Sequence, residues 1–388
     1  MVSDQTYDVA VIGAGVFGAW TAYQLSRAGK TVLLVDAYGP GNSRSSSGGE
    51  SRMMRMGYGP DQIYTCMAQR SLALWQELLG PSALFHTSGI LWLARANDAY
   101  CEATLETLMQ LKVRCERLDR DELAARYPQL KFDSVAWGIL EPDSGVLLAR
   151  RAVRAVVAHA LKSGVTYLEG AVLPPVDQRE GLGSVGLDRL VTVSGREILA
   201  DQFVFACGPW LPKLFPTLLA DRIYVTRQEV FFFGVPAGSE VFDPKFMPAW
   251  IDFNNLIYGI PNLESRGFKV AIDAHGSQFD PDTGERIVSR EGLAAVRALL
   301  RQRVPLLAEA PVTETRVCQY ENTSSGDFLI DRHPGFANVW LVGGGSGHGF
   351  KHGPAVGEAV ATLVSGTGQI EPRFSLTTKE TVQQRKVY

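Results

Sequence analysis

The first residues that could do chemistry lie near the start of the chain, in Gly13-Ala14-Gly15-Val16-Phe17-Gly18. A GxGxxG segment turns tightly, lets a pyrophosphate approach the backbone and begins a helix whose free N–H groups bind phosphate. Asp36 follows at a spacing from which an acidic side chain accepts hydrogen bonds from a ribose. We therefore expect a dinucleotide site formed by Gly13, Gly15, Val16, Gly18 and Asp36.

The segments around this motif are those that a phosphate-binding turn needs. Residues 7–12 and 31–35 are short, β-branched apolar runs, typical of buried parallel strands. Residues 16–28 between them predict a helix that ends near Gly29. One βαβ unit thus positions the glycines, which favours a dinucleotide site over a purely structural glycine turn.

Three further segments of small residues favour FAD over a nicotinamide cofactor, which stays open as an alternative. The loop 41–49 follows the second strand and would let a bulky ring lie against backbone. A predicted strand over 201–206 and another over 338–342 each end in a second set of small residues. The additional cofactor-binding candidates in these loops are Ser43, Arg44, Ser47, Cys207, Gly208, Gly345, Gly347 and Gly349.

Cationic side chains stand beside these loops. Arg52 and Arg55 are three residues apart, so on a helical turn or an irregular loop both could point into one site. Arginine binds a carboxylate through two N–H groups at once, although two solvated surface arginines are the plainer interpretation. Lys269 lies in an apolar strand, where a charge is costly unless it is paired or used; an edge-strand lysine that faces water is the alternative.

The composition indicates a globular enzyme-sized chain. Its 388 residues predict two or three domains, and 46% hydrophobic residues provide a sizeable core. A net charge of −3 argues against nucleic acid as a partner, and no apolar run is long enough for a membrane helix. Five cysteines without metal-ligand spacing argue against a metal site and a disulfide framework. We expect a cytoplasmic location, since residues 1–7 show no secretory signal.

The predicted fold class is α/β (α+β overall): a discontinuous Rossmann-like FAD-binding domain with an inserted mixed or antiparallel-sheet substrate domain. Strand-like segments over 223–233, 257–260 and 268–272, separated by Pro, Gly and Asp, indicate the inserted sheet. The expected FAD-binding domain comprises residues 1–85, 140–218 and 318–375, the substrate domain residues 86–139 and 219–317, and a tail residues 376–388.

Five segments together resemble the monomeric sarcosine oxidase family of flavin amine oxidases, which includes N-methyltryptophan, pipecolate and fructosyl-amino-acid oxidases. The resemblance spans nearly the whole chain. It implies an FAD domain, a mixed-sheet substrate domain, and oxidation of a secondary amine to an imine while O2 becomes H2O2. The segments are the N-terminal fingerprint, 51–55, 206–208, 318–323 and the run 328–334 with 347–351.

The resemblance also implies roles for single residues. Cys318 matches the cysteine that is joined covalently to the flavin through a thioether. Arg52 would lie near the ring, and Arg55 and Lys351 would bind the substrate carboxylate. Lys269 would help O2 accept electrons, because negative charge develops beside the ring. The expected catalytic residues are Lys269, Arg52, Lys351, His348 and Tyr320, with Lys351 also near the flavin.

One position departs from the family pattern. Sarcosine oxidases carry a histidine four residues after the lysine, where this chain has Asp273. A carboxylate there favours a cationic or polyhydroxylated substrate group, so sarcosine becomes doubtful as the main substrate. Tyr258 and Met247 are candidate pocket walls, although both types are more often core residues.

The expected function is an FAD-dependent oxidase of an N-alkyl or cyclic amino acid. The alternative is a flavin-dependent amine or imino-acid dehydrogenase with another electron acceptor. The expected partners are a small-molecule amine and O2, and the expected state is a monomer.

Overall fold

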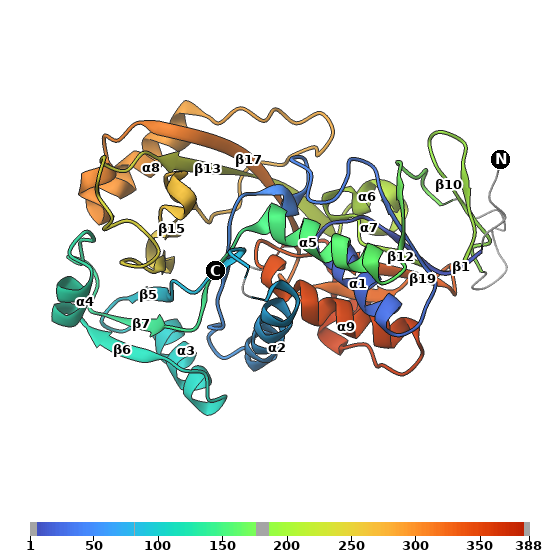
Figure 1. The fold of residues 1–388 in the computed structure, drawn as a ribbon, viewed down its shortest axis with the longest axis horizontal. Helices are drawn as coiled ribbons and strands as arrows, with labels where there is room; N and C mark the ends of the chain where they lie inside the picture. Colours follow the sequence, from blue (N-terminus) through green and yellow to red (C-terminus); the bar gives the residue numbers. More distant parts are fainter. Residues whose placement is uncertain (1–5, 81, 176–185, 384–388) are drawn as a thin grey trace.

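The computed structural model describes residues 6–80, 82–175 and 186–383. Two large sheets lie on opposite sides of the molecule (Figure 1). The first has six strands in the order β18-β19-β12-β1-β2-β9, and all are parallel except β18. Both faces of such a sheet are covered, which explains the uninterrupted apolar runs of its strands. Its strands are β1 (Tyr7–Ile12), β2 (Val32–Asp36), β9 (Thr166–Glu169), β12 (Ala200–Phe205), β18 (Leu329–Arg332) and β19 (Val339–Gly343).

Helix α1 is central to the packing on this sheet. It contacts α9 and α5, and α2 packs on α9. Trp20 of α1 meets Trp75 of α2 edge to face, with the ring centroids 5.0 Å apart. The helices are α1 (Val16–Arg27), α2 (Gln62–Leu79), α5 (Ala149–Lys162) and α9 (Gly353–Val364).

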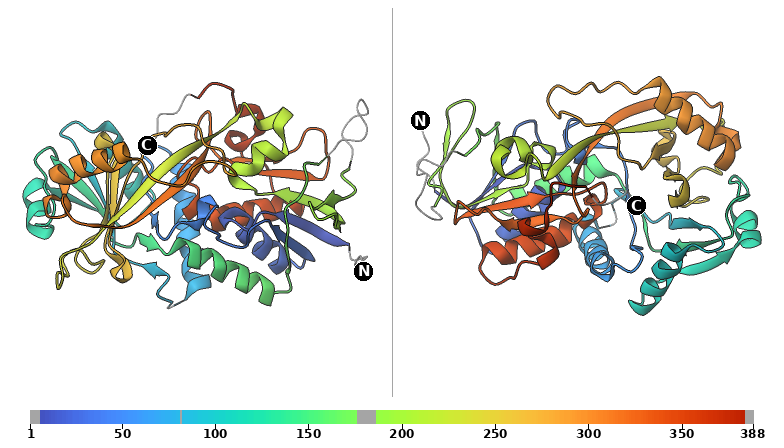
Figure 2. Two further views of the ribbon diagram at one scale, coloured as in Figure 1. Left: turned by 90° about the horizontal axis from the view of Figure 1, so that it is seen from above. Right: turned by 180° about the vertical axis from the view of Figure 1, so that it is seen from behind.

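The second sheet has eight strands in the order β17-β13-β16-β15-β14-β5-β7-β6. Its neighbours pair antiparallel, except that β14 and β5 are parallel. The long pair β13 and β17 runs from this sheet toward the six-stranded one (Figures 1 and 2). The strands are β5 (Ile90–Ala94), β6 (Glu116–Asp119), β7 (Trp137–Glu141), β13 (Ile223–Phe233), β14 (Ala249–Asp252), β15 (Ile257–Ile260), β16 (Phe268–Ile272) and β17 (Val312–Thr323).

Smaller elements complete the described chain. A three-stranded sheet, β3-β8-β4, places Arg52 at the start of β3 opposite Leu147 of β8. The remaining strands are β3 (Arg52–Met54), β4 (Phe85–His86), β8 (Gly145–Leu147), β10 (Leu190–Val191) and β11 (Glu197–Ile198). The remaining α-helices are α3 (Ala99–Gln110), α4 (Arg120–Arg126), α6 (Leu211–Leu214), α7 (Pro216–Leu219) and α8 (Arg290–Arg303). The short 3-10 helices are η1 (Ser46–Gly48), η2 (Gly208–Trp210), η3 (Phe253–Asn255), η4 (Leu263–Ser265), η5 (Pro305–Leu307), η6 (Phe350–His352), η7 (Pro372–Phe374) and η8 (Leu376–Thr378).

The predicted mixed α/β class and the predicted βαβ unit are confirmed. Three details differ. Residues 52–54 form a strand, so the helical turn considered for Arg52 and Arg55 is wrong. A helix is expected from the sequence around residues 104–111, but α3 begins earlier, at Ala99, because Asp98 caps it by accepting a hydrogen bond from the Cys101 N–H. Strand β17 was not predicted.

The predicted division into an FAD-binding and a substrate domain stays a prediction, and its boundary at residue 318 falls inside β17. Residues 384–388 of the expected tail lie outside the described residues. Within the described ranges, no helix combines the length and apolar character needed to cross a bilayer.

Candidate functional site

A cavity of about 360 Å³ runs along the carboxyl ends of β1, β2, β12 and β19. In an open parallel sheet this edge is where ligands bind. One end of the cavity is lined by Asp36 and the turn at Gly13, and the other by Arg52 and Cys318. Other predicted residues in its wall are Gly15, Val16, Ser47, Cys207, Gly208, Gly345, Gly347 and Gly349.

The turn between β1 and α1 leaves room only for glycine at two positions. Gly13 has a φ of +103°, and a Cβ there would lie 2.4 Å from the carbonyl oxygen of Ala206. A Cβ on Gly18 would lie 1.8 Å from the Gly13 carbonyl oxygen. Gly18 therefore does not line the cavity; it allows α1 to pack closely on the turn that does.

Hydrogen bonds hold this turn open toward the cavity. The Ala14 N–H donates to Asp36 Oδ2 at 2.7 Å, and the Tyr38 N–H donates to Oδ1 at 2.9 Å. The Val16 N–H donates to Ser47 Oγ at 3.0 Å. Burial is the main cause that raises the pKa of Asp36. These bonds fix the turn, and the start of α1 directs the positive end of its dipole toward the cavity, whose wall includes Gly15 and Val16.

A second, smaller cavity of about 90 Å³ adjoins the far end of the first. Some residues line both cavities and form their common wall: Arg52, Cys318, Tyr320, Ser346, Gly347 and Phe350. A flat ring placed in the large cavity beside Cys318 would therefore face the small cavity.

Cys318 lies on β17 next to a guanidinium group. Arg52 Nη2 is 3.5 Å from Cys318 Sγ, and the same nitrogen donates to the Ser46 carbonyl at 2.8 Å. Arg52 Nη1 donates to the Ser51 carbonyl at 2.9 Å. These backbone contacts fix a positive charge beside the sulfur.

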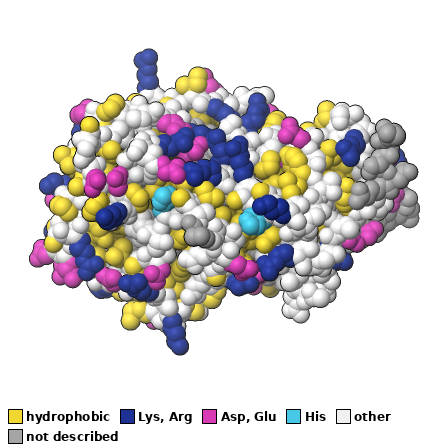
Figure 3. All heavy atoms as spheres, in the orientation of Figure 1, with side chains coloured by type: hydrophobic (Ala, Val, Ile, Leu, Met, Phe, Trp, Pro, Cys, Tyr) yellow, Lys and Arg dark blue, Asp and Glu magenta, His cyan; other side chains and the backbone are white. Residues whose placement is uncertain are grey.

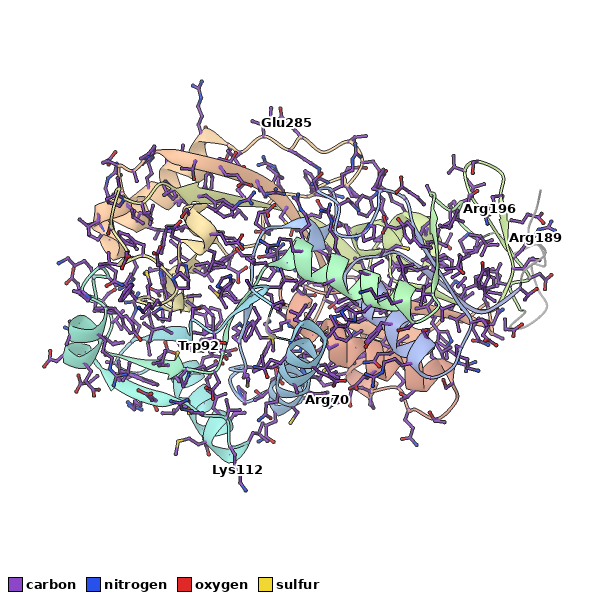
Figure 4. The ribbon with its side chains drawn as sticks, in the orientation of Figure 1. Arg70, Trp92, Lys112, Arg189, Arg196 and Glu285 are labelled. Atoms are coloured by element: carbon purple, nitrogen blue, oxygen red, sulfur yellow. The ribbon has the colours of Figure 1, made fainter. Side chains whose placement is uncertain are left out.

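Two buried cations, Arg55 and Lys351, line the small cavity. The Arg55 guanidinium lies 4.3 Å from the Tyr58 ring centroid and 5.0 Å from that of Trp92, a cation–π arrangement. Lys351 Nζ donates to Tyr58 Oη at 2.6 Å and to the His348 carbonyl at 2.9 Å. Figure 4 shows Trp92 inside the molecule, whereas the charged residues Lys112, Arg189 and Glu285 lie at its edge.

Glu141, which the sequence analysis missed, positions the segment that carries Arg55. Its carboxylate is 1% exposed and accepts the N–H groups of Met56 and Gly57 at 2.7 and 3.0 Å. It also accepts from Trp92 Nε1 at 2.7 Å and from Ser144 Oγ at 2.6 Å. Such a set of hydrogen bonds offsets the cost of burying the charge. A lone acidic residue at the end of an apolar strand is the signal that could have identified it.

Lys269 is 2% exposed, so the alternative of a water-facing lysine is wrong. Its Nζ donates to the Ser51 carbonyl at 2.8 Å, and its side chain lines the small cavity. Burial, and then the Arg52 guanidinium, hold the pKa of Lys269 well below its ordinary value.

Asp273 and Tyr320 meet across the small cavity. The Tyr320 hydroxyl donates to Asp273 Oδ1 at 2.8 Å. Burial, together with this carboxylate, raises the pKa of Tyr320 well above its ordinary value. Tyr258 lines the same cavity, and burial raises its pKa as well. The small cavity thus has cations on one wall and an acceptor oxygen on another.

His348 lines the small cavity, but both its ring nitrogens have protein partners. Nδ1 lies 3.2 Å from Tyr58 Oη, and Nε2 lies 3.0 Å from the Gly326 carbonyl. His352 Nε2 lies 2.7 Å from the same Tyr58 oxygen. Burial, and then Lys351, hold the pKa of His352 well below its ordinary value. Sequence reasoning missed Tyr58 and His352, which surround Lys351.

Besides Gly18, three of the predicted site residues lie outside both cavity walls. Ser43 and Arg44 are exposed, and the Arg44 guanidinium lies over the Tyr38 ring. Met247 is 1% exposed and belongs to the hydrophobic core with Phe242 and Phe268. The expectation that Met247 lines the pocket is therefore wrong, because its side chain is used in core packing.

The large cavity fits FAD in shape and chemistry. It is apolar over most of its wall and begins at a glycine turn in which a Cβ on Gly13 would strike the Ala206 carbonyl. An acidic side chain, Asp36, lies at the end beside this turn, and a cysteine with an arginine lies at the other end. When FAD is bound, Gly13, Gly15 and Val16 would hold the phosphates, and Asp36 the ribose.

Comparisons with known proteins agree with this fit. The chain matches the model of the "FAD dependent oxidoreductase" family over residues 8–363. It is 31% identical to a monomeric sarcosine oxidase of Bacillus sp. (strain B-0618), over 95% of each chain. It is 29% identical to N-methyl-L-tryptophan oxidase of Salmonella newport (strain SL254), over 96% of this chain and 97% of that one.

The fold is also that of solved flavoenzyme structures. L-proline dehydrogenase from P. horikoshii superposes with a TM-score of 0.83 at 20% identity, covering 96% of this chain and 97% of the other. The resemblance to the sarcosine oxidase family is thereby confirmed. The chain belongs to the FAD dependent oxidoreductase family and is a homologue of the sarcosine oxidases.

Proposed function

We propose that the protein is an FAD-dependent oxidase that converts a secondary-amine amino acid, N-alkyl or cyclic, to an imine. The supporting observation is the pair of buried cations, Arg55 and Lys351, in a small cavity that shares a wall with the FAD-sized one. Membership of the family supports an FAD-dependent oxidoreductase that acts on CH–NH donors.

When bound, FAD would supply the redox chemistry: acceptance of a hydride from the carbon beside the amine nitrogen, with O2 taking up the two electrons and two protons as H2O2. Arg55 and Lys351 bind the substrate carboxylate by charge and hydrogen bonds. They thereby hold the amine-bearing carbon at the common wall of the two cavities. The amine loses its proton on becoming an imine, which water hydrolyses after release.

Lys269 is proposed to assist the reaction with O2. Its Nζ lies in the small-cavity wall, where a protonated amine stabilises the negative charge that develops on oxygen. Arg52 would stabilise negative charge on the reduced ring from the side of Cys318. Tyr320 and His348 are proposed to contact the substrate or the ring from the same walls.

Cys318 is proposed to hold the ring through a thioether to its 8-methyl group. Formation of this bond would remove one hydrogen from the thiol and one from the methyl group, and O2 would take up these two electrons and two protons. Acid precipitation tests this: yellow colour should stay with precipitated protein and move to the supernatant in C318A. Free colour from the unsubstituted chain would contradict covalent attachment.

Asp273 is proposed to select the substrate. A carboxylate that already accepts from Tyr320 favours a side group with hydroxyls or a positive charge over the methyl group of sarcosine. A peroxide-coupled screen of N-alkyl, cyclic and sugar-linked amino acids tests this proposal. Substrate turnover without peroxide would instead indicate a dehydrogenase with another acceptor.

We also propose that the protein works as a cytoplasmic monomer. The face in Figure 3 carries basic side chains interspersed with acidic ones. Such a mixture does not favour a polyanion as partner. Light scattering at several concentrations would test the monomer, since a mass that doubles would contradict it.

A further inference from the structure

Glu321 is a buried carboxylate with an unused oxygen in the wall of the large cavity. Its side chain comes from β17 and the residue is 8% exposed. Oε1 accepts from the Gly345 N–H at 3.2 Å. Oε2 is buried and has no hydrogen-bond partner among the described residues.

No cation in the described part of the chain forms an ion pair with the Glu321 carboxylate. Burial raises its pKa to about 7, against the effect of the Gly345 and Gly344 N–H groups. Leaving a buried acceptor without a partner costs about 1–3 kcal/mol, and a charged one costs more. A ligand hydroxyl would remove that cost.

Two glycines locate Glu321 Oε2 relative to the six-stranded sheet. A Cβ on Gly208, after β12, would lie 3.7 Å from Oε2, and one on Gly343, at the end of β19, would lie 3.5 Å away. Glu321 is also three residues after Cys318 on β17, and it lines the large cavity together with Gly208 and Cys318. In FAD the segment that joins the phosphates to the ring is the ribityl chain, which carries hydroxyls.

We propose that Glu321 binds the ribityl chain of FAD, with Oε2 accepting a hydrogen bond from a ribityl hydroxyl. The proposal rests on the placement of the ring beside Cys318 in the proposed function. Glu321 would then contribute to the affinity for FAD independently of the contacts that the Asp36 end of the cavity makes with the adenosine half.

The test uses the C318A background, in which FAD exchanges freely. Flavin fluorescence quenching gives the Kd for FAD, and calorimetry gives the Kd for ADP, which lacks the ribityl chain. E321A should weaken FAD binding about tenfold or more, in line with a hydrogen bond to a charged group, and leave ADP binding unchanged. E321Q places an amide at the same position, with one oxygen acceptor and one N–H2 donor group. Its Kd for FAD should stay within about threefold of the parent's value.

Two results would overturn the proposal. E321A could bind FAD as the parent does, or it could lose FAD and ADP equally, which would indicate a collapsed turn. Should E321A fail to fold, FAD analogues that each lack one ribityl hydroxyl replace it. The C318A parent should then bind one analogue about tenfold more weakly, whereas equal binding of all analogues would contradict the proposal. Failure of amine oxidation would leave these affinities unaffected, so the two proposals are tested separately.

Discussion

The two ends of the cavity system, the proposed nucleotide end at Gly13 and the proposed substrate end at Arg55 and Lys351, are built differently. The nucleotide end uses backbone: the N–H groups at the start of α1, glycines at Gly13 and Gly18, and one carboxylate, Asp36. The substrate end uses buried charged side chains, Arg55, Lys351 and Lys269, each held by carbonyls or aromatic rings. The first end is assembled within about 36 residues of sequence, and the second from segments more than two hundred residues apart.

This difference matters for how each end responds to change. A cradle built mainly from backbone fails when the chain itself is displaced, and few of its contacts depend on a side chain. A cavity of buried charges depends on single side chains, because removing one partner leaves the others uncompensated. We therefore expect the largest effects of single substitutions at the substrate end.

The largest effect is expected at Lys269. K269M should slow the reaction of reduced enzyme with O2 about 10³-fold, because a preorganised positive charge is lost. Anaerobic reduction by substrate should change far less. Stopped-flow absorbance measures both half-reactions, and equal slowing of the two would contradict the role.

The same experiment has a pH dependence. Because the pKa of Lys269 is well below its ordinary value, its side chain loses its proton and its charge at a lower pH than a free lysine does. Reoxidation should therefore slow as pH rises, and K269M should abolish this dependence.

The next effect is expected at the carboxylate-binding wall. K351M should lower kcat/KM for the best amino-acid substrate about 10²-fold, equivalent to about 3 kcal/mol, by removing a buried charge. K162M, at the exposed end of α5, serves as the matched control and should leave kcat/KM unchanged. Steady-state peroxide assays measure both; a K351M enzyme with the parent's kcat/KM would exclude Lys351 from the binding site.

A smaller effect is expected from the cradle. G13A should weaken FAD binding about 30-fold in the C318A background, since the new Cβ would strike the Ala206 carbonyl. G29A is the matched control: Gly29 also has a positive φ, of +80°, but has nothing within 4 Å of a Cβ. It should cost about 1 kcal/mol of stability and leave the Kd for FAD unchanged. Equal losses of FAD affinity in both variants would contradict the close-approach explanation.

The smallest effect is expected at Asp273. D273N removes the charge but keeps a hydrogen-bond acceptor for Tyr320, so the fold should persist. The ratio of kcat/KM for a cationic or polyhydroxylated substrate over sarcosine should fall about tenfold. An unchanged ratio would show that Asp273 does not select the substrate.

The glycine turn and the position of Asp36 beside it could be predicted from the sequence, because these residues are close in the chain and their spacing follows from one βαβ turn. Their role toward a nucleotide stays a prediction. Strand β17 escaped prediction since its first half alternates Thr, Glu and Arg and is half exposed, so it lacks an apolar run. Met247 could not be distinguished from a pocket residue by its type alone. Glu141, Tyr58 and His352 act through neighbours that are distant in sequence, and their roles became visible only in three dimensions.

The most direct test compares an N-alkyl amino acid that the enzyme oxidises with the amide of the same amino acid. The amide differs in lacking the carboxylate charge. Initial rates of peroxide formation by the purified enzyme give kcat/KM for both. Recognition by Arg55 and Lys351 predicts that the acid is preferred by about 10²-fold or more, and that K351M removes most of this preference. Equal kcat/KM values for acid and amide would contradict the carboxylate-binding role of the buried cations.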